Sequence, residues 1–285
     1  MSSTCALPPL KNLVLCADDF AWSASVSEAI VRLAQAHRIS ATSAMVLSPR
    51  WSEDAARLKE LREQIDVGLH LDWTSDFAIA QGHGQPLAPI MLRSLLPSAF
   101  GGLNADAVRV QIERQLDAFE SVWQAPPDHI DGHQHVQQFG TIRQALLQVM
   151  ARRYAGFQPY LRASRPPTGQ ANFKGRVMAA WGSQALIREA ALQGIPCAPA
   201  LSGIYDLFDE RLDYAGLMDR WLAQVPEGTL LMCHPGLARP DHATCAQVDH
   251  AYARVAEWQH LSSGLFAEQL QARGVHLMRG TSLYR

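Results

Sequence analysis

Residues 12–19 (NLVLCADD) join a short apolar run directly to two adjacent carboxylates. An apolar run without alternation is typical of a strand that is buried on both faces. Residues 24–37 follow, with Val26, Ile30 and Leu33 at helical spacing. A buried strand followed by an amphipathic helix is the repeating unit of a largely parallel α/β sheet, so the N-terminal stretch predicts that fold class.

The same alternation continues along the chain and predicts further strands and helices. Strands are predicted at 42–47, 66–71, 129–131, 160–163, 198–201, 229–233 and 275–278, and helices at 51–63, 105–123, 140–153, within 172–193, 209–223 and within 246–272. Residues 72–104 are rich in glycine and proline and break the rhythm. So long an insertion is usually functional, and we predict a lid or a substrate-binding loop. No repeat or linker divides the chain, which predicts one domain over 1–285.

The composition narrows the classes of partner and location. The formal net charge is −2, so there is no global basic field to attract nucleic acid or an anionic membrane surface. No run approaches the ~20 apolar residues of a membrane span. The five cysteines have no C-x-x-C spacing, and residues 1–11 do not resemble a secretion signal. We therefore predict a reducing, cytoplasmic location, while the sequence leaves open whether the chain forms a homo-oligomer.

Polar side chains gather where the predicted strands end. The C-terminal ends of parallel barrel strands converge on one face, and that face carries the active site. Residues far apart in the sequence can therefore meet around one small volume. The candidates are Asp18, Asp19, His70, the segment 129–135 (HIDGHQH), Arg162 and His234.

These residue types favour hydrolysis assisted by a metal ion. One carboxylate and two neutral imidazoles, with open positions for water, form an established hydrolytic metal site. Such an ion lowers the pKa of water and polarises a carbonyl oxygen. A second carboxylate that does not bind the ion can act as general base, and adjacent aspartates at a strand end suit this division. An arginine near the base would orient it, and a histidine opposite the ion would protonate the leaving group.

Taken alone, most of these residues also have an ordinary structural interpretation. Asp18-Asp19 would serve as a helix cap, His70 as a core histidine, Arg162 as a surface ion-pair residue and His234 as a turn residue. The three imidazoles and one carboxylate within 129–135 are harder to explain by packing. The histidines without supporting polar neighbours are interpreted as structural or exposed: His37, His83, His242, His250, His260 and His276.

Four motifs together resemble the YdjC/ChbG-like carbohydrate deacetylases, a family that includes a hopanoid-biosynthesis-associated branch. They are 17–20 (ADDF), 67–71 (VGLHL), 129–136 (HIDGHQHV) and 232–236 (MCHPG), in order along the chain. The resemblance implies a distorted (β/α) TIM-like barrel. It also implies removal of an N-acetyl group from an amino sugar, in an oligosaccharide or a glycolipid, with release of acetate. One divalent ion, magnesium or zinc, is implied as the cofactor.

The resemblance also assigns roles by motif position. The implied metal ligands are Asp19, His70 and His133, and the implied catalytic residues are Asp18 as base, His234 as acid and Arg162 as orienting partner. Three departures bear on the substrate more than on the ion. Ala21 replaces a glycine at a turn that needs positive φ, Gln137 replaces a histidine and removes a polar contact, and 72–74 reads DWT rather than an Asn-Leu-Thr-like pattern.

Two other functions stay open. The chain could be a different metal-dependent hydrolase such as a phosphoesterase, although it lacks a P-loop-like glycine run and an evident Arg/Lys phosphate clamp. It could also be a catalytically inactive, carbohydrate-binding homologue that keeps the barrel. The full set of base, ligands and acid favours an enzyme.

Overall fold

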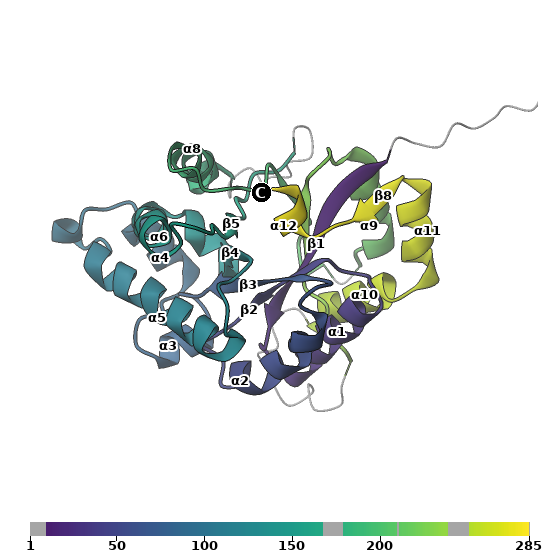
Figure 1. Cartoon of the computed structure of the whole chain (residues 1–285), viewed down its shortest axis with the longest axis horizontal. Helices are drawn as coiled ribbons and strands as arrows, with labels where there is room; N and C mark the ends of the chain where they lie inside the picture. Colours follow the sequence, from purple (N-terminus) through teal and green to yellow (C-terminus); the bar gives the residue numbers. More distant parts are fainter. Residues whose placement is uncertain (1–9, 168–178, 210, 239–250, 285) are drawn as a thin grey trace, which may run out of the picture.

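The computed structural model describes residues 10–167, 179–209, 211–238 and 251–284. Within these ranges an eight-stranded parallel sheet forms the centre of the molecule, with α4, α5 and α6 on one side of the strands and α9, α10 and α11 on the other (Figure 1). The strands are β1 (Lys11–Phe20), β2 (Ala41–Ala44), β3 (Asp66–Leu71), β4 (His129–Gly132), β5 (Tyr160–Leu161), β6 (Leu201–Ser202), β7 (Leu230–Cys233) and β8 (Val275–Leu277).

Helices fill most of the connections between strands. They are α1 (Ala24–Gln35), α2 (Trp51–Asp54), η1 (Ala55–Leu61), α3 (Asp76–Ala80), α4 (Leu87–Arg93), η2 (Ser98–Phe100), α5 (Ala105–Trp123), η3 (His133–Gln138), α6 (Gly140–Arg153), η4 (Ala179–Ser183), α8 (Gln184–Leu192), α9 (Tyr214–Gln224), α10 (Ala251–Leu261), α11 (Gly264–Ala272) and α12 (Gly280–Leu283). Small polar residues begin several of them: the side chains of Ser23, Asn104 and Asp213 accept first-turn N–H groups of α1, α5 and α9. None of the described helices is long and apolar enough to cross a bilayer.

The sheet curls towards a closed barrel. Its hydrogen-bonded order is β5-β4-β3-β2-β1-β7-β6, and β8 pairs with the start of β1. Across the gap between the two ends of this order, Leu161 of β5 forms a parallel bridge to Cys197, and its N–H donates to the carbonyl of Pro196 over 2.8 Å. This link joins β5 to the segment that leads into β6. The predicted distorted TIM-like barrel is confirmed.

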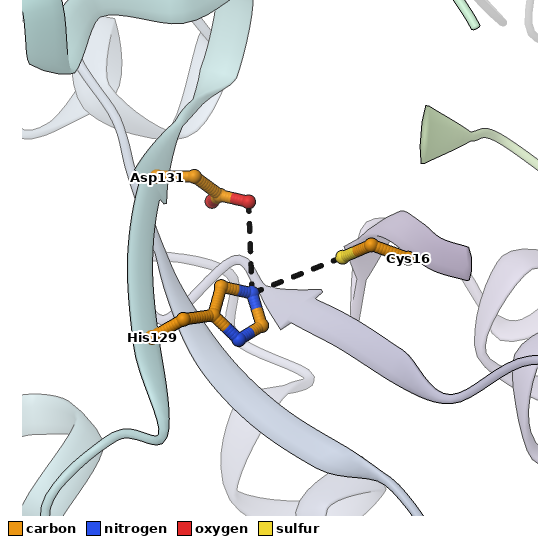
Figure 2. Close-up of side chains that lie close together, drawn as sticks. All are labelled: Cys16, His129 and Asp131. Atoms are coloured by element: carbon orange, nitrogen blue, oxygen red, sulfur yellow. Dashed lines mark hydrogen bonds and ion pairs between the residues drawn. The ribbon is translucent and has the colours of Figure 1, made fainter. Parts of the chain in front are cut away.

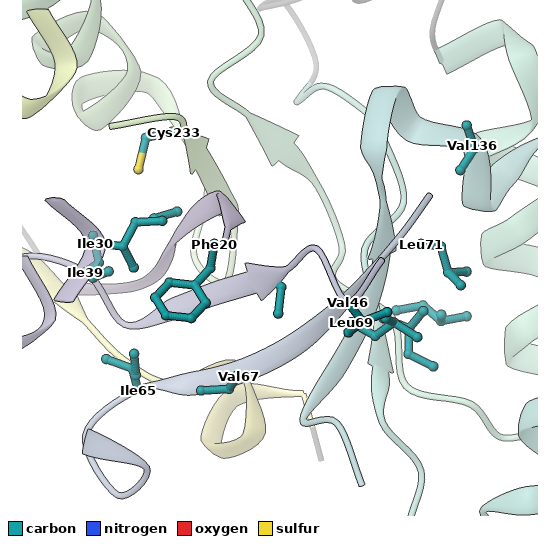
Figure 3. Close-up of a cluster of buried hydrophobic side chains, with 14 of the residues drawn as sticks. Phe20, Ile30, Ile39, Val46, Ile65, Val67, Leu69, Leu71, Val136 and Cys233 are labelled. Atoms are coloured by element: carbon teal, nitrogen blue, oxygen red, sulfur yellow. The ribbon is translucent and has the colours of Figure 1, made fainter. Parts of the chain in front are cut away.

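Apolar side chains pack on both faces of the sheet because residues of a strand alternate between them. The larger cluster, between strands and helices, includes Phe20, Ile30 and Leu69 (Figure 3). A smaller cluster contains Val14 and Cys16 of β1. This second cluster lies inside the barrel, since strands that are not neighbours in the sheet contact one another there.

Three of the differences between predicted and observed elements lie in the connections between strands. The insertion at 72–104 contains three short helices, α3, α4 and η2, so its predicted irregularity is only partly right. The helix predicted at 51–63 starts as α2 and tightens into the 3₁₀ helix η1. The helical region predicted within 246–272 is two helices, because the side chain of Ser263 caps α11. Residues 246–250 lie outside the described residues, as do His242, His250, Cys5 and Cys245.

Candidate active site

The predicted site residues converge at the C-terminal ends of the strands. A cavity of about 160 Å³ opens there. Five of the six predicted residues line it: Asp18, Asp19, His70, His133 and His234. The sixth, Arg162, follows β5 and is fully buried, so it is not the surface ion-pair residue that it would be if taken alone.

A strained turn at the end of β1 presents the two aspartates. Asp19 has a φ of 67° and Ala21 a φ of 72°, so the turn keeps positive φ although an alanine occupies the expected glycine position. Each such residue costs on the order of 1–3 kcal/mol and persists only where the surrounding structure holds it in place. The hydroxyl of Ser27 accepts the N–H of Ala21 over 3.1 Å and donates to the buried Asp54 over 2.6 Å, and Ser48 donates to the Ala21 carbonyl over 2.7 Å. These hydrogen bonds hold the turn in its strained conformation.

Asp19, His70 and His133 surround one point. The Asp19 Oδ1 atom lies 3.5 Å from His70 Nε2 and 3.4 Å from His133 Nδ1, and it is buried without a hydrogen-bond partner. Atoms that share an ion at about 2.1 Å lie roughly 3–3.5 Å apart, so this donor set fits a divalent cation. Burial opposes ionisation of Asp19, but Arg254 and His133 hold its pKa well below the ordinary value. The carboxylate is therefore charged.

Asp131 orients His70 from behind. Its Oδ1 atom lies 2.6 Å from His70 Nδ1, which leaves Nε2 directed towards Asp19. Burial favours the neutral ring, but the Asp131 and Asp18 carboxylates outweigh it and raise the pKa of His70 to about 9. A carboxylate on the far nitrogen of a metal-binding histidine is a common way to fix its orientation and tautomer. No role of its own was predicted for Asp131 from the sequence.

A second group of ligand-type side chains lies beneath this site. Cys16, His129 and Asp131 point towards one another inside the barrel (Figure 2). The Ser43 hydroxyl lies between them, donating to Asp131 Oδ2 over 2.5 Å and lying 3.0 Å from His129 Nε2. Burial also raises the pKa of the Cys16 thiol well above its usual range. We interpret this group as hydrogen-bonded support for Asp131 rather than as a second ion site.

Arg162 holds Asp18 with both ends of its guanidinium group. Its Nη1 and Nη2 atoms donate to the two Asp18 oxygens over 2.6 Å and 2.7 Å. Asp18 Oδ2 lies 4.0 Å from His70 Nε2 and 3.9 Å from His234 Nε2. Gln137, which stands where the family pattern has a histidine, donates to the Arg162 carbonyl over 2.7 Å. That the replacement removes a polar contact near the site stays a prediction.

Two charged residues of α10 complete the site, and neither was predicted from the sequence. Arg254 Nη2 lies 2.5 Å from Asp19 Oδ2, and the buried Glu257 accepts the backbone N–H of His234. Burial lowers the pKa of His234, but Glu257 and Asp18 outweigh this and raise it. The feature of the sequence that could have indicated them is their spacing, since Arg254 and Glu257 are charged residues at i and i+3 within a largely apolar stretch.

His135 adds a neutral imidazole to the cavity wall. Burial, reinforced by Arg162, lowers its pKa to about 3. Its Nδ1 atom lies 2.8 Å from the Ser164 hydroxyl. Gln134 and His135 both have positive φ, of 51° and 62°, and both line the cavity. Strain of this kind clusters at functional sites, which marks this turn as part of the site.

Comparison with known proteins places the whole arrangement in one family. A family model described as "YdjC-like protein" matches residues 12–272. The chain belongs to the YdjC-like family. The resemblance drawn from the sequence motifs is confirmed, and the match covers every residue of the site described above.

Relatives of this YdjC-like chain carry deacetylase names. The chitooligosaccharide deacetylase of Serratia marcescens is 26% identical over 279 residues, which cover 93% of this chain and 96% of that protein. The Proteus mirabilis protein of the same name is 33% identical over 141 residues, 46% of this chain and 51% of its own length. The match to the human carbohydrate deacetylase is 31% over 144 residues, 45% of this chain and 42% of that protein.

One solved structure supports the fold. It is a candidate cellobiose-phosphate cleavage protein from Enterococcus faecalis V583, with a TM-score of 0.68 and 20% identity. The similarity covers 97% of this chain and all of that one. At this level of identity the likeness bears on the architecture alone.

Proposed function

We propose that this YdjC-like chain is a metal-dependent hydrolase that removes an N-acetyl group from an amino sugar and releases acetate. The observation that carries the proposal is the unpaired Asp19 Oδ1, which two imidazole nitrogens flank in a cavity that Asp18 and His234 also line. The deacetylase names of the relatives support the substrate class.

Asp19, His70 and His133 would hold the ion through Oδ1, Nε2 and Nδ1. When bound, a divalent ion polarises the amide carbonyl and lowers the pKa of water. Magnesium and zinc both accept carboxylate and imidazole ligands, and two imidazoles in a set of three favour zinc.

Asp18 and His234 divide the proton transfers. Asp18, held by Arg162, takes a proton from the attacking water as the water oxygen bonds to the carbonyl carbon. His234 gives its proton to the amide nitrogen as the C–N bond breaks. The products are acetate and the free amino sugar. Because Glu257 and Asp18 raise the pKa of His234, the ring keeps its proton to higher pH than an ordinary histidine.

The cavity wall suits a sugar ring. Its polar part consists of the site residues, and its apolar part includes Leu87, Ile204, Leu207 and Met232. A pyranose offers hydroxyl groups at its edge and C–H groups on its faces, which match these two kinds of surface. For a phosphate ester the fit is poorer, because Arg162 and Arg254 each pair with a carboxylate of the site.

Acetate release tests the proposal. Purified protein loaded with zinc or magnesium is expected to release acetate from N-acetylglucosamine oligomers or glycolipids, and a chelator should stop the reaction. Asp18→Asn should lower kcat by about 10²–10⁴-fold, the usual contribution of a general base, without loss of bound ion by elemental analysis. Asp106→Asn, a change of the same type at an exposed residue, is the control.

Two outcomes would replace the proposal. Sugar binding without acetate release at full ion occupancy would indicate a carbohydrate-binding homologue. Release of phosphate from phosphate esters, without acetate from acetylated sugars, would indicate a phosphoesterase.

A further inference from the structure

We propose that Arg254 and Glu257 form a positioning pair on α10 that fixes the ion ligand Asp19 and the proton donor His234. The roles of Asp19 and His234 rest on the proposed function. Neither residue of the pair belongs to a motif identified in the sequence. They lie one helical turn apart, and both are on the buried face of α10.

Arg254 restricts how Asp19 can meet an ion. Its Nη2 atom lies 2.5 Å from Asp19 Oδ2, and its side chain is 5% exposed. With Oδ2 occupied, Oδ1 is the carboxylate oxygen left for the ion, and the carboxylate cannot turn freely. The guanidinium group also lies 6.0 Å from the centroid of Trp22, whose ring is 5.4 Å from that of His133. Arg254 therefore supports one ligand directly and a second through Trp22.

Glu257 restricts His234 in a similar way. Its Oε2 atom accepts the His234 N–H, and its Oε1 atom accepts the Tyr205 hydroxyl over 2.5 Å. Oε1 also lies 3.9 Å from His234 Nδ1, a buried atom without a hydrogen-bond partner. The opposite ring nitrogen, Nε2, lies 3.9 Å from Asp18 Oδ2. The carboxylate thus anchors the backbone of His234 and lies behind its ring, with Nε2 on the side of the reacting groups.

A purely structural role for the pair makes a different prediction. Buried ion pairs that only support the fold would change the free energy of unfolding when broken. They would leave the affinity of the ion and the titration of His234 unchanged in a protein that stays folded. These two quantities therefore separate positioning from packing, and neither requires a substrate.

Ion affinity tests the Arg254 half. Calorimetric titration of metal-free protein with zinc should show Arg254→Gln binding about 10–100-fold more weakly, the usual cost of losing a residue behind a ligand. Arg254→Lys keeps the positive charge but lacks the planar guanidinium group, so it should recover only part of the zinc affinity. Arg273→Gln breaks an exposed Arg–Asp pair of 2.7 Å to Asp219 and serves as the control. Equal or tighter zinc binding by folded Arg254→Gln would overturn the inference.

The titration of His234 tests the Glu257 half. The charged or titratable groups that face it are Asp18 and Asp19 from β1, Arg254 and Glu257 from α10, and His135 from η3. Glu257→Gln keeps the shape and an acceptor oxygen but removes one negative charge. The pKa of His234, followed by NMR in metal-free protein and assigned with His234→Gln, should fall by roughly 1–3 pH units.

The same variant should move the alkaline limb of the kcat/KM profile to lower pH, because His234 must be protonated to act as acid. Glu268→Gln, the same charge change at an exposed site on α11, should move neither quantity. An unchanged His234 titration in folded Glu257→Gln would overturn the inference. If the unmodified protein released no acetate, that result would instead count against the proposed function. The zinc and NMR titrations do not depend on acetate release.

Discussion

Asp19 and Asp66 are both buried aspartates of the parallel sheet, but they lie at opposite ends of its strands. Asp66 begins β3 and accepts hydrogen bonds on both oxygens, from Arg279 Nε, Tyr160 Oη and both the N–H and hydroxyl of Thr281. Asp19 lies near the C-terminal end of β1 and pairs with Arg254 through one oxygen only. Its second oxygen has imidazole nitrogens nearby and no hydrogen bond.

The difference shows how one barrel separates stability from chemistry. A buried acceptor without a partner costs roughly 1–3 kcal/mol, so the end of the barrel that carries Asp19 is the less stable arrangement in the absence of an ion. The fully paired Asp66 ties the C-terminal residues Arg279 and Thr281 to the start of β3. In parallel barrels the C-terminal ends of the strands carry catalysis and the N-terminal ends carry stability, and the role proposed for Asp19 and the pairing of Asp66 agree with that division.

Matched Asp→Asn substitutions give the largest expected effect. Asp66→Asn removes one partner of a buried pair and should lower the free energy of unfolding by about 3 kcal/mol, while zinc affinity stays within a few-fold. Asp19→Asn also breaks a buried pair, with Arg254, but its Oδ1 atom makes no hydrogen bond that could be lost, so the loss of stability should be smaller than in Asp66→Asn. Its zinc affinity should fall by about 10²-fold or more. Urea unfolding and calorimetric titration measure the two quantities. Equal losses of stability in both variants would contradict the division between the two ends.

A proton-release measurement should give the next largest effect. The pKa of His70 is raised from 6.5 to about 9, so in metal-free protein its stabilising contribution is complete below about pH 6.5 and is lost as the pH rises through about 9. An ion needs the neutral ring, so ion binding at pH 7.5 should release close to one proton from His70. Calorimetry in buffers of different ionisation enthalpy counts the proton.

Asp131→Asn supplies the control for that count. The Asp131 carboxylate makes the largest of the contributions that raise the pKa of His70, so the variant should release much less than one proton at pH 7.5. The same release in both proteins would show that the proton comes from another group.

The sequence predicted the strand ends, and with them Asp18, Asp19, His70, His133 and His234 around one cavity, because parallel strands bring their carboxyl ends together. It did not predict the residues behind them. Arg254 meets Asp19 across 235 positions, and no fixed spacing links a helix face to a strand end. Asp131 was visible within its motif, but its orienting role depends on the register that sets it beside His70.

The short elements escaped prediction for a local reason. Helix α3 spans five residues and α4 seven, too few for an apolar stripe to emerge from the pattern. For α3 the sequence signal was the residue before the helix, since the Ser75 hydroxyl accepts the N–H groups of Phe77 and Ala78. Whether this insertion closes over a substrate stays a prediction.

The smallest expected effect concerns the strain at the Asp19 end. In Ala21→Gly, relief of the strain in the left-handed backbone should raise the free energy of unfolding by about 1–2 kcal/mol. Loss of a buried methyl group and the greater freedom of the unfolded chain should offset most of that gain, so the net change should stay below about 1 kcal/mol. Ala44→Gly is the matched variant, because Ala44 is equally buried in the same apolar cluster but does not have positive φ. Ala44→Gly should lower the free energy of unfolding by about 1–2 kcal/mol, since no backbone strain is relieved there.

The difference between the two variants in urea unfolding therefore measures the strain in the turn that presents Asp18 and Asp19. Equal losses in both would mean that the turn holds no such strain, and that the hydrogen bonds from Ser27 and Ser48 serve only to order it.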